Sequence, residues 1–578
     1  MNLKLTHDSR SSEYRLPLGA RKTGDTVVLR LRVRGGVPDR VTLRIWWENA
    51  EQRFEMTAPK GNGLFEYALT LPDRPGLMWY FFIVEIGGCP HFYGNAYDRM
   101  GGEGALYAHE PPSFQLTVFD SAYQPPEWMG DGIMYQIMVD RFCAKNPVHP
   151  PQGWLHPAWH EPPALNLDPA SGDNQADDFF GGNLKGVMEK LPYLKELGVT
   201  VLYFNPIFRS PSNHKYNTGD YRLIDPSFGT EEDFVRLCEK AREMNIRIIL
   251  DGVFSHTGSD SKYFNRYGTY DSTGAYQSTE SPYYSWYSFD QWPDRYDSWW
   301  GFDTLPNVRE MDENYLAYIL TGEDAIVPMW LGKGASGWRL DVADELPMEF
   351  LRILRRSAKA KKPDCCVLGE VWEDASNKTA YGELRSYCLG DTLDSVMNYP
   401  LRDGVIDFLT FRLSASQLKR QLDSLYENYP EPFARSLMNL LGSHDKARII
   451  NRLSGATPED CPREQRRHAP LSPEAYELGR ERYIRAWTFI CHMPGMPCMY
   501  YGDEAGAQGE DDPFCRGTYP WGREDTFLLS EIARINRMRH ESRVLRRGSM
   551  KLIAPNEDTL IVRRTLPGYP ALEYTLRR

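Results

Sequence analysis

Four short segments, each an apolar run that ends in charged or polar residues, decide the fold of this chain. They are LDGVFSH (residues 250–256), GWRLDVADE (337–345), LGEVW (368–372) and LLGSHD (440–445). Each is typical of a buried strand of a parallel sheet, with its polar residues placed where the strand ends. Because the acidic residues lie on different strands, they can meet only if the carboxyl ends of those strands gather in one place, as they do in a closed barrel.

The sequence around these segments alternates short apolar strands with amphipathic helices, which is typical of βα units and a parallel sheet. About eight strands are predicted, over 133–138, 199–207, 246–253, 337–342, 366–372, 393–397, 437–441 and 497–501. A helix is expected over 231–244, where Thr230 and Asp233 resemble a capping box. Eight such units over roughly 400 residues favour an α/β fold, a (β/α)8 TIM barrel, with a doubly wound sheet as the alternative.

The regions outside the barrel have their own patterns. Residues 1–122 contain period-two strands and predict an N-terminal β-sandwich domain. The barrel domain is expected over 128–540, with an inserted subdomain at 256–307 after the third strand. Within it, residues 263–302 include 15 aromatic side chains, which predicts a subdomain over the barrel mouth, with a purely structural mini-core as the alternative. A short C-terminal β segment is predicted over 541–578.

The composition is that of a folded protein and argues against several classes of function. Of 578 residues, 41% are hydrophobic and 25% are charged, close to the globular average. The net charge of −12 disfavours nucleic acid as a partner, because phosphate contacts need a basic surface. No signal peptide or membrane span is predicted, and ten cysteines without a CxxC pair suggest neither a zinc site nor a disulfide framework. A cytoplasmic protein is therefore expected.

The spacing within the four segments predicts their chemistry. Arg339 and Asp341 are two residues apart on one strand, so both point to the same side, and the guanidinium is expected to keep Asp341 ionised. Glu370, flanked by apolar Leu368 and Trp372 and approached by other carboxylates, is expected to keep its proton. An ionised nucleophile beside a protonated acid is the arrangement for glycoside hydrolysis with retention.

Three further residues complete this hypothesis. Asp445 could bind sugar hydroxyls and favour an oxocarbenium-like transition state, while His256 and His444 would donate hydrogen bonds to the same ring. For any single acid, a strand-end cap or a structural ion pair is the alternative. Four acidic strand ends with flanking His and Arg are much less easily explained as structural.

In order and spacing, these segments resemble the four signature regions of the alpha-amylase family of glycoside hydrolases, and the resemblance covers roughly residues 130–540. Within that family the chain is similar to the neopullulanase, cyclomaltodextrinase and maltogenic amylase group. Further motifs carry this placement, together with the β-sandwich ahead of the barrel: YQIMVDRF (135–142), SPSNHKYNTGDY (210–221), GEVWEDAS (369–376), LDSVMNY (393–399) and YYGDEAG (500–506).

The resemblance implies a role for each residue. Asp341 would be the nucleophile, Glu370 the general acid/base and Asp445 the transition-state stabiliser. The implied substrate-binding residues are Tyr216 beneath the cleaved sugar, His256, Arg339 and His444 around that sugar or the nucleophile, Trp372 on the leaving-group side, and Asp251 as support. The implied activity is cleavage of α-1,4 bonds, with α-1,6 bonds left open, in maltooligosaccharides, cyclodextrins, pullulan or starch. A glucanotransferase and a non-catalytic glucan-binding protein are the alternatives.

Three departures from the family limit what is carried over. Ser255 stands where the family usually has Asn, and Asn183 stands where the group usually has an Asp that helps to bind calcium. Residues 143–147 also lack acidic ligands, so the sequence predicts no required cofactor and disfavours Ca²⁺. The third departure is the short C-terminal segment, which is either truncated or leans on another subunit. In the group resembled, the starch-binding-like N-terminal sandwich often serves dimerisation, which would make a homodimer.

Overall fold

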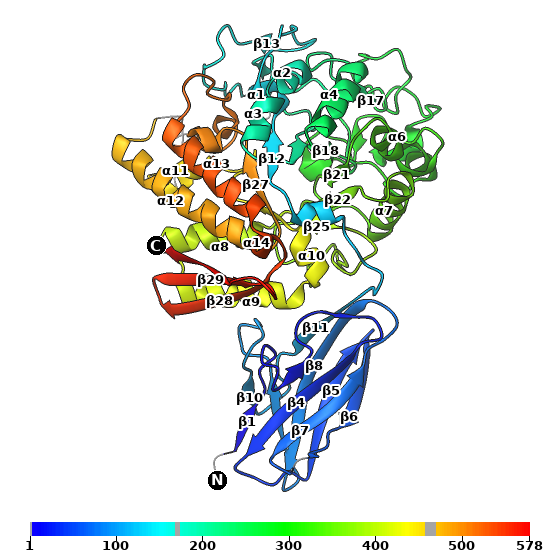
Figure 1. The fold of residues 1–578 in the computed structure, drawn as a ribbon. Helices are drawn as coiled ribbons and strands as arrows, with labels where there is room; N and C mark the ends of the chain where they lie inside the picture. Colours follow the sequence, from blue (N-terminus) through cyan, green and yellow to red (C-terminus); the bar gives the residue numbers. More distant parts are fainter. Residues whose placement is uncertain (1–2, 60, 168–173, 457–469) are drawn as a thin grey trace. The chain divides into compact units, whose positions relative to one another are not determined.

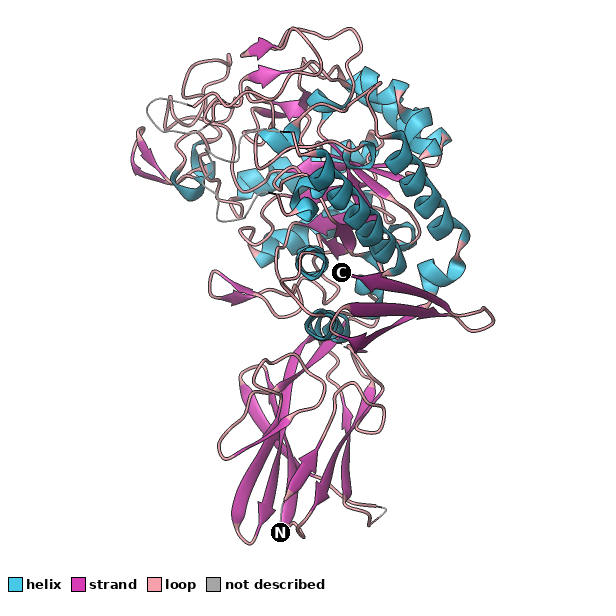
Figure 2. Ribbon diagram, turned by 90° about the vertical axis from the view of Figure 1, so that its left-hand side faces the viewer, coloured by secondary structure: helices cyan, strands magenta, loops and turns pink. Residues whose placement is uncertain are grey.

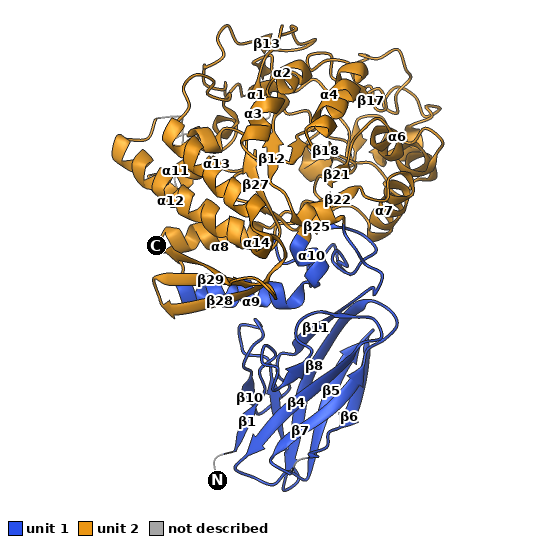
Figure 3. Ribbon diagram, viewed as in Figure 1, with its two compact units in different colours: residues 1–125, 373–394, 415–435 blue, residues 126–372, 395–414, 436–578 orange. Residues whose placement is uncertain are grey.

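The computed structural model describes residues 3–59, 61–167, 174–456 and 470–578, and the chain divides into two compact units (Figure 3). The first unit comprises Met1–Pro125, Glu373–Asp394 and Ala415–Arg435, and the second comprises Pro126–Trp372, Ser395–Ser414 and Ser436–Arg578. Two segments within the range predicted for the barrel, 373–394 and 415–435, thus belong to the first unit. No helix in the described part of the chain is long and apolar enough to cross a membrane.

The first unit is built on two sheets that enclose one core, and their strand pairs are antiparallel except for the parallel pair of β3 with β11. One sheet contains β1 (Lys4–Thr6), β4 (Thr26–Arg34), β2 (Arg15–Leu16) and β7 (Leu64–Thr70). The other contains β10 (Ala105–Tyr107), β9 (Cys89–Gly94), β8 (Gly76–Ile86), β11 (Phe114–Phe119), β3 (Arg21–Lys22), β5 (Arg40–Trp47) and β6 (Ala50–Glu55). Alternate residues from both sheets, such as Leu29 in β4 and Phe82 in β8, are fully buried in the shared core. The predicted N-terminal sandwich is confirmed.

The two later segments of this unit are tied to the sandwich by polar contacts. They carry α9 (Ala415–Asn428), α10 (Glu431–Ser436), β23 (Thr379–Ala380) and β24 (Glu383–Leu384). Glu427 in α9 accepts hydrogen bonds from Arg10 at 2.7 Å and Arg15 at 3.2 Å. Gln115 in β11 donates to Ser376 at 3.2 Å and accepts from Asn377 at 2.7 Å. The first unit therefore includes residues that follow Glu370 in the sequence.

The second unit contains the predicted barrel (Figure 1). Eight parallel strands run in the order β25 (Ser395–Val396), β22 (Cys366–Gly369), β21 (Gly337–Leu340), β18 (Arg247–Gly252), β15 (Val201–Phe204), β12 (Met134–Ile137), β27 (Met496–Tyr500) and β26 (Met438–Leu440). A parallel bridge between Met397 and Met438 brings the two edge strands together and nearly closes the ring. Seven of the eight strands fall within their predicted ranges, and β27 begins one residue before its range of 497–501. The near-closure of the ring excludes the doubly wound alternative.

Helices surround the barrel strands (Figure 2). They are α1 (Val139–Phe142), α2 (Leu184–Glu189), α3 (Leu191–Glu196), α4 (Glu231–Glu243), α5 (Glu313–Leu316), α6 (Ile326–Gly332), α7 (Met348–Lys361), α8 (Tyr399–Leu409), α11 (Ile449–Ser454), α12 (Pro473–His492), α13 (Thr526–Glu541) and α14 (Arg543–Arg547). The predicted capping box is present at α4, where the Thr230 hydroxyl accepts from the Asp233 amide and the Asp233 carboxylate accepts from the Thr230 amide.

The inserted subdomain after β18 has little regular structure beyond the hairpin of β19 (Phe289–Gln291) and β20 (Arg295–Tyr296). Tyr263, Phe264 and Trp286 are fully buried within it, so part of its aromatic content forms a local core. Two further short pairs are β13 (Trp154–Leu155) with β14 (Asp178–Phe179) and β16 (Phe208–Arg209) with β17 (Asp220–Ile224). The chain ends in a three-stranded antiparallel sheet of β28 (Ser549–Asn556), β29 (Thr559–Thr565) and β30 (Leu572–Arg577).

Candidate active site

One buried arginine gathers three carboxylates at the carboxyl ends of neighbouring barrel strands. Arg339 in β21 lies with Nη1 2.8 Å from Asp341 Oδ1 and 3.0 Å from Asp251 Oδ2, and with Nη2 2.9 Å from Glu370 Oε2. Asp251 belongs to β18, and Glu370 directly follows β22. The strand order β18–β21–β22 explains this convergence, because parallel strands present their carboxyl ends at one face of the barrel.

The charges of this cluster do not cancel. Burial raises the pKa of Asp341 well above its usual value, and although Arg339 opposes this, the charges of Glu370 and Asp251 add to it. Burial likewise raises the pKa of Asp251 to about 6. Arg339 favours the ionised form of Asp341 as expected, but it does not offset the effect of burial, because one cation is shared among three buried carboxylates. The cluster instead retains a proton at a pH at which isolated carboxyl groups are ionised.

Glu370 is held by donors on both of its oxygens. The Val342 amide donates to Oε2 at 2.9 Å, and the Trp372 indole nitrogen donates to Oε1 at 3.2 Å. The Trp372 ring stacks on Tyr399 with centroids 4.6 Å apart, and Lys446 Nζ lies 3.9 Å from its ring centroid. Trp372 remains 40% exposed. The acid is thus fixed in orientation by an aromatic ring that still faces solvent.

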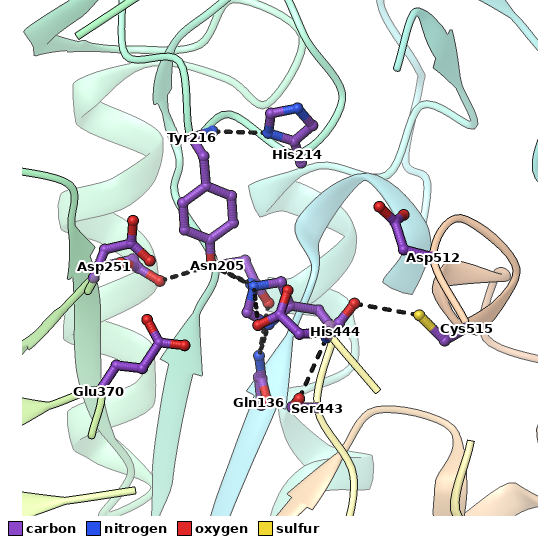
Figure 4. Close-up of polar contacts among 12 residues, drawn as sticks. Gln136, Asn205, His214, Tyr216, Asp251, Glu370, Ser443, His444, Asp512 and Cys515 are labelled. Carbon is purple, nitrogen blue, oxygen red and sulfur yellow. Dashed lines mark hydrogen bonds and ion pairs between the residues drawn. The ribbon is translucent and has the colours of Figure 1, made fainter. Parts of the chain in front are cut away.

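A chain of hydrogen bonds runs from Gln136 in β12 to the carboxylate cluster (Figure 4). Gln136 Nε2 donates to His444 Nδ1 at 2.9 Å, His444 Nε2 donates to the Tyr216 hydroxyl at 2.6 Å, and that hydroxyl donates to Asp251 Oδ2 at 3.1 Å. An amide nitrogen can only donate, so Nδ1 accepts and the ring proton lies on Nε2. Burial also lowers the pKa of His444 well below its usual value, which keeps the imidazole neutral.

Asp445 lies beside this chain and is paired with a buried cation. Arg516 Nη2 is 3.4 Å from Asp445 Oδ1, and His444 Nε2 is 3.2 Å from Asp445 Oδ2. The Arg516 Nε atom also donates to the His444 carbonyl oxygen at 3.0 Å. The Asp445 side chain is 30% exposed, so it has room for contacts beyond Arg516.

His256 is held in place through one of its two ring nitrogens. The Ser255 hydroxyl lies 3.0 Å from His256 Nδ1, so the residue that departs from the family pattern still holds the ring. His256 Nε2 is buried and has no hydrogen-bond partner among the described residues. Burial lowers the pKa of His256 to about 4, so the ring is neutral near pH 7. An unpaired buried nitrogen of this kind is suited to a ligand hydroxyl.

The structure brings all of the predicted site residues together at one end of the barrel. They are Asp251, His256, Arg339, Asp341, Glu370, Trp372, Tyr216, His444 and Asp445. Two further residues contact the site: Asn205 Nδ2 donates to the Tyr216 hydroxyl at 2.9 Å, and the Tyr203 hydroxyl donates to Asp251 Oδ2 at 2.6 Å. Sequence reasoning missed Gln136, Asn205, Tyr203, Lys446 and Arg516. Gln136 had a signal, because it is a polar residue inside the apolar strand of YQIMVDRF. Lys446 had no signal beyond its position next to Asp445 in the sequence, and Arg516 had none. Only the folded chain shows what these two side chains contact.

A family model for the alpha amylase catalytic domain matches residues 136–543. The amylopullulanase of Thermoanaerobacter thermohydrosulfuricus is 37% identical over 613 aligned positions, which cover 96% of this chain and 40% of that protein. The cyclomaltodextrinase of Geobacillus thermopakistaniensis is 31% identical, with 92% of this chain and 84% of that protein covered. The chain spans less than half the length of the amylopullulanases that it matches.

A solved structure shows the same relationship. The cyclic alpha-maltosyl-(1→6)-maltose hydrolase of Arthrobacter globiformis superimposes with a TM-score of 0.65 and 29% sequence identity, covering 76% of this chain and 89% of that chain. The matched family region includes every barrel strand except part of β12, and all of the site residues described above. The chain therefore belongs to the alpha-amylase family of glycoside hydrolases.

Proposed function

We propose that this protein is a retaining α-glucan hydrolase. It cleaves α-1,4 glucosidic bonds, and with them α-1,6 bonds, in maltooligosaccharides, cyclodextrins, pullulan or starch. This proposal rests on the ion pairs that Asp341 and Glu370 form with the two terminal nitrogens of the buried Arg339 guanidinium. The names of the relatives, which include cyclomaltodextrinase, neopullulanase and amylopullulanase, support the class of substrate.

The geometry divides the chemistry between two carboxyl groups. In its ionised form, Asp341 attacks the anomeric carbon of the bound sugar from its place beside Arg339, while Glu370 in its protonated form gives its proton to the departing glycosidic oxygen. Glu370 then takes a proton from the water that releases the sugar from Asp341. Microscopic reversibility makes the same group acid in one step and base in the next.

The remaining residues bind the cleaved sugar. Tyr216 lies beneath the ring, oriented by its bonds to His444 and Asp251, and the unpaired His256 Nε2 donates to a ring hydroxyl. Asp445 accepts from sugar hydroxyls and stabilises the positive charge that develops on the ring in the transition state. These groups are already in place in the protein, so little reorganisation accompanies the reaction.

Product chromatography tests the proposal. The protein is incubated in parallel with β-cyclodextrin, pullulan and soluble starch, and maltose or panose is expected. Products longer than the substrate at high acceptor concentration would instead indicate glucanotransfer, since the same glycosyl-enzyme can pass to a sugar. Release of nothing from any of the three would contradict a hydrolase and favour a glucan-binding protein.

The pH dependence of activity follows from the electrostatic interaction between Asp251 and Asp341. Asp251→Asn removes one negative charge near Asp341, which makes ionisation of the nucleophile easier and lowers its pKa. We expect the acid limb of the kcat/KM profile to move to lower pH by about one unit, because kcat/KM reports groups of the free enzyme. A limb that stays in place or moves to higher pH would show that Asp251 does not act on Asp341 in this way.

We also propose that the enzyme needs no cofactor and no calcium. Asn183 caps α2 through Oδ1, which accepts from the Gly186 amide at 2.8 Å, and its Nδ2 donates to the carbonyls of Lys145 at 2.9 Å and Gly181 at 3.4 Å. Lys145 is itself paired with Glu189 at 2.6 Å. The Asn183 side-chain N–H groups thus face the carbonyl oxygens of Lys145 and Gly181, which a calcium ion would need as ligands. These residues therefore do not fit a calcium ion.

EDTA and CaCl₂ are therefore expected to change the thermal midpoint by no more than about 1 °C. Differential scanning calorimetry with each additive measures this. Asn183→Asp is the matched variant, because it turns the two donors into a carboxylate that repels both carbonyls. Its midpoint is expected to fall in EDTA and to recover partly in CaCl₂. A fall of several degrees for the unmodified protein in EDTA would overturn the proposal.

Location and assembly are proposed on narrower grounds. Seven cysteines in the described part of the chain are free thiols, and six of them are buried, which supports a reducing, cytoplasmic environment: Cys89, Cys143, Cys238, Cys388, Cys491, Cys498 and Cys515. The resemblance of the sandwich to that of the neopullulanase group supports a homodimer formed through this domain. Sedimentation of the protein with and without residues 1–122 measures the second point, and a monomer at all concentrations would contradict it.

A further inference from the structure

Lys446 places a cation in the site that none of the described carboxylates pairs with. The residue directly follows Asp445 in the sequence, and its side chain is half-buried. Its ammonium forms no ion pair and no hydrogen bond with any described residue. Burial lowers the pKa of Lys446, which means that the ammonium loses part of its hydration in the folded protein. Loss of water around a charged group is unfavourable unless other acceptors replace that water.

The ammonium lies against the two aromatic rings beside the acid. Lys446 Nζ is 3.9 Å from the centroid of the Trp372 ring and 5.8 Å from that of the Tyr399 ring. An aromatic ring attracts a cation placed over its face. The ring cannot, however, accept all three N–H bonds of an ammonium, because these donors need lone pairs such as those of oxygen. The contact with Trp372 therefore fixes the position of the ammonium and leaves donors free for a ligand.

Two neighbours of Lys446 indicate which part of a substrate this ligand is. Asp445, the preceding residue, contacts the cleaved sugar in the proposed mechanism. Trp372 donates to Glu370 Oε1 at 3.2 Å, and Glu370 protonates the departing glycosidic oxygen. That oxygen belongs to the next glucose unit of the chain, so the surface beside Trp372 is where this unit passes. Trp372 is 40% exposed, which leaves room for such a unit.

We propose that Lys446 is a specificity-determining residue whose ammonium donates a hydrogen bond to a hydroxyl oxygen of the glucose unit on the leaving-group side of the cleaved bond. This rests on the proposed function. The same place is occupied by the unit that departs in hydrolysis and by the unit that accepts in glucanotransfer. Lys446 therefore strengthens the binding of both units and favours a glucan acceptor over water.

Two substrates separate this role from the chemistry. Maltohexaose has glucose units on both sides of the cleaved bond, whereas α-maltosyl fluoride has only a fluoride on the leaving-group side. Lys446→Met keeps most of the side-chain stem and removes the donor. It is expected to lower kcat/KM on maltohexaose about tenfold, mainly through KM, and to change kcat/KM on α-maltosyl fluoride less than about twofold. Lys446→Arg keeps a cationic donor and is expected to lose less.

Transfer to an added acceptor measures binding on the leaving-group side by itself. Once fluoride has left, the maltosyl group on the enzyme passes either to water or to methyl α-glucoside. The acceptor concentration that gives half-maximal transfer is expected to rise about tenfold in Lys446→Met. Acceptors that lack the hydroxyl at C2, C3 or C6 identify the oxygen involved. One of them should bind about tenfold more weakly to the unmodified protein, and this difference should disappear in Lys446→Met.

Lys190→Met is the matched control. Lys190 Nζ lies 3.7 Å from the Trp521 ring centroid and likewise forms no ion pair with any residue in the described part of the chain, but Trp521 does not belong to the site. This variant is expected to leave both substrates and the acceptor unaffected.

Three results would overturn the proposal. They are equal losses of Lys446→Met on both substrates, an unchanged acceptor concentration for half-maximal transfer, and a deoxy-acceptor difference that is absent from the unmodified protein or persists in Lys446→Met. A loss on maltohexaose confined to kcat would also overturn it, because Lys446 would then act only by supporting Trp372 and the acid. An unmodified protein inactive on both substrates would instead refute the proposed function itself.

Discussion

Asp341→Asn is expected to lower kcat on β-cyclodextrin by about 10⁴-fold or more, because an amide cannot form the glycosyl-enzyme bond. The amide oxygen can still accept from Arg339 Nη1, so the fold should persist. Product chromatography of matched amounts of variant and unmodified protein measures the loss. Activity within a factor of ten of the unmodified protein would show that Asp341 is not the nucleophile.

The stability of this variant gives an independent check. The pKa of Asp341 is higher in the folded protein than in the unfolded chain. As the pH rises from the unfolded-state pKa to the folded-state pKa, Asp341 therefore lowers the free energy of unfolding by an increasing amount. Removing the ionisable group should therefore leave the thermal midpoint at pH 7 equal or higher. Asp324→Asn, at an exposed position, is the matched control and should change neither activity nor midpoint. A clear fall in the Asp341→Asn midpoint would contradict the account of the cluster.

Glu370→Gln is expected to lower kcat on maltohexaose by about 10³-fold or more, because the amide cannot protonate the departing oxygen. The loss on α-maltosyl fluoride should be much smaller for the first step, since fluoride leaves without a proton. Azide should restore turnover and give α-maltosyl azide, because an anionic nucleophile needs no general base to attack the glycosyl-enzyme. Mass spectrometry and NMR of the azide product measure this.

The comparison of substrates distinguishes acid catalysis from simple misplacement. In Glu370→Gln the side-chain oxygen can still accept from either the Trp372 indole or the Val342 amide, but not from both. Trp372→Phe, which removes only that donor, should cause a smaller loss on maltohexaose and should not respond to azide. Equal losses of Glu370→Gln on both substrates, with no azide product, would assign the role of acid to another residue.

Much of the fold could be predicted because its signals are local. The eight apolar runs, the capping box at Thr230 and Asp233, and the polar strand ends are written in short stretches of sequence. The convergence of Asp251, Asp341 and Glu370 followed from strand order, because neighbouring parallel strands place their ends together. These site residues could therefore be identified from the sequence pattern alone.

What could not be predicted depends on contacts between distant residues. Helix α9 is amphipathic like any barrel helix, and only the folded chain shows that its Glu427 is held by Arg10 and Arg15, more than 400 residues earlier. The pKa of Asp341 depends on how deeply it is buried and on how many carboxylates share Arg339. Neither the burial of Asp341 nor the number of carboxylates around Arg339 can be read from the two-residue spacing of Arg339 and Asp341. That spacing predicts only that the two side chains point to the same side of the strand.

Trapping the glycosyl-enzyme tests the central claim most directly. The protein is treated with 5-fluoro-α-glucosyl fluoride, whose ring fluorine slows release of the sugar from the nucleophile, then digested and analysed by peptide mass spectrometry. The account predicts one added fluoroglucosyl group on the peptide that contains Asp341, and none in Asp341→Asn. A label on another carboxylate, such as Asp251 or Asp445, or turnover of the reagent without any covalent adduct, would contradict it.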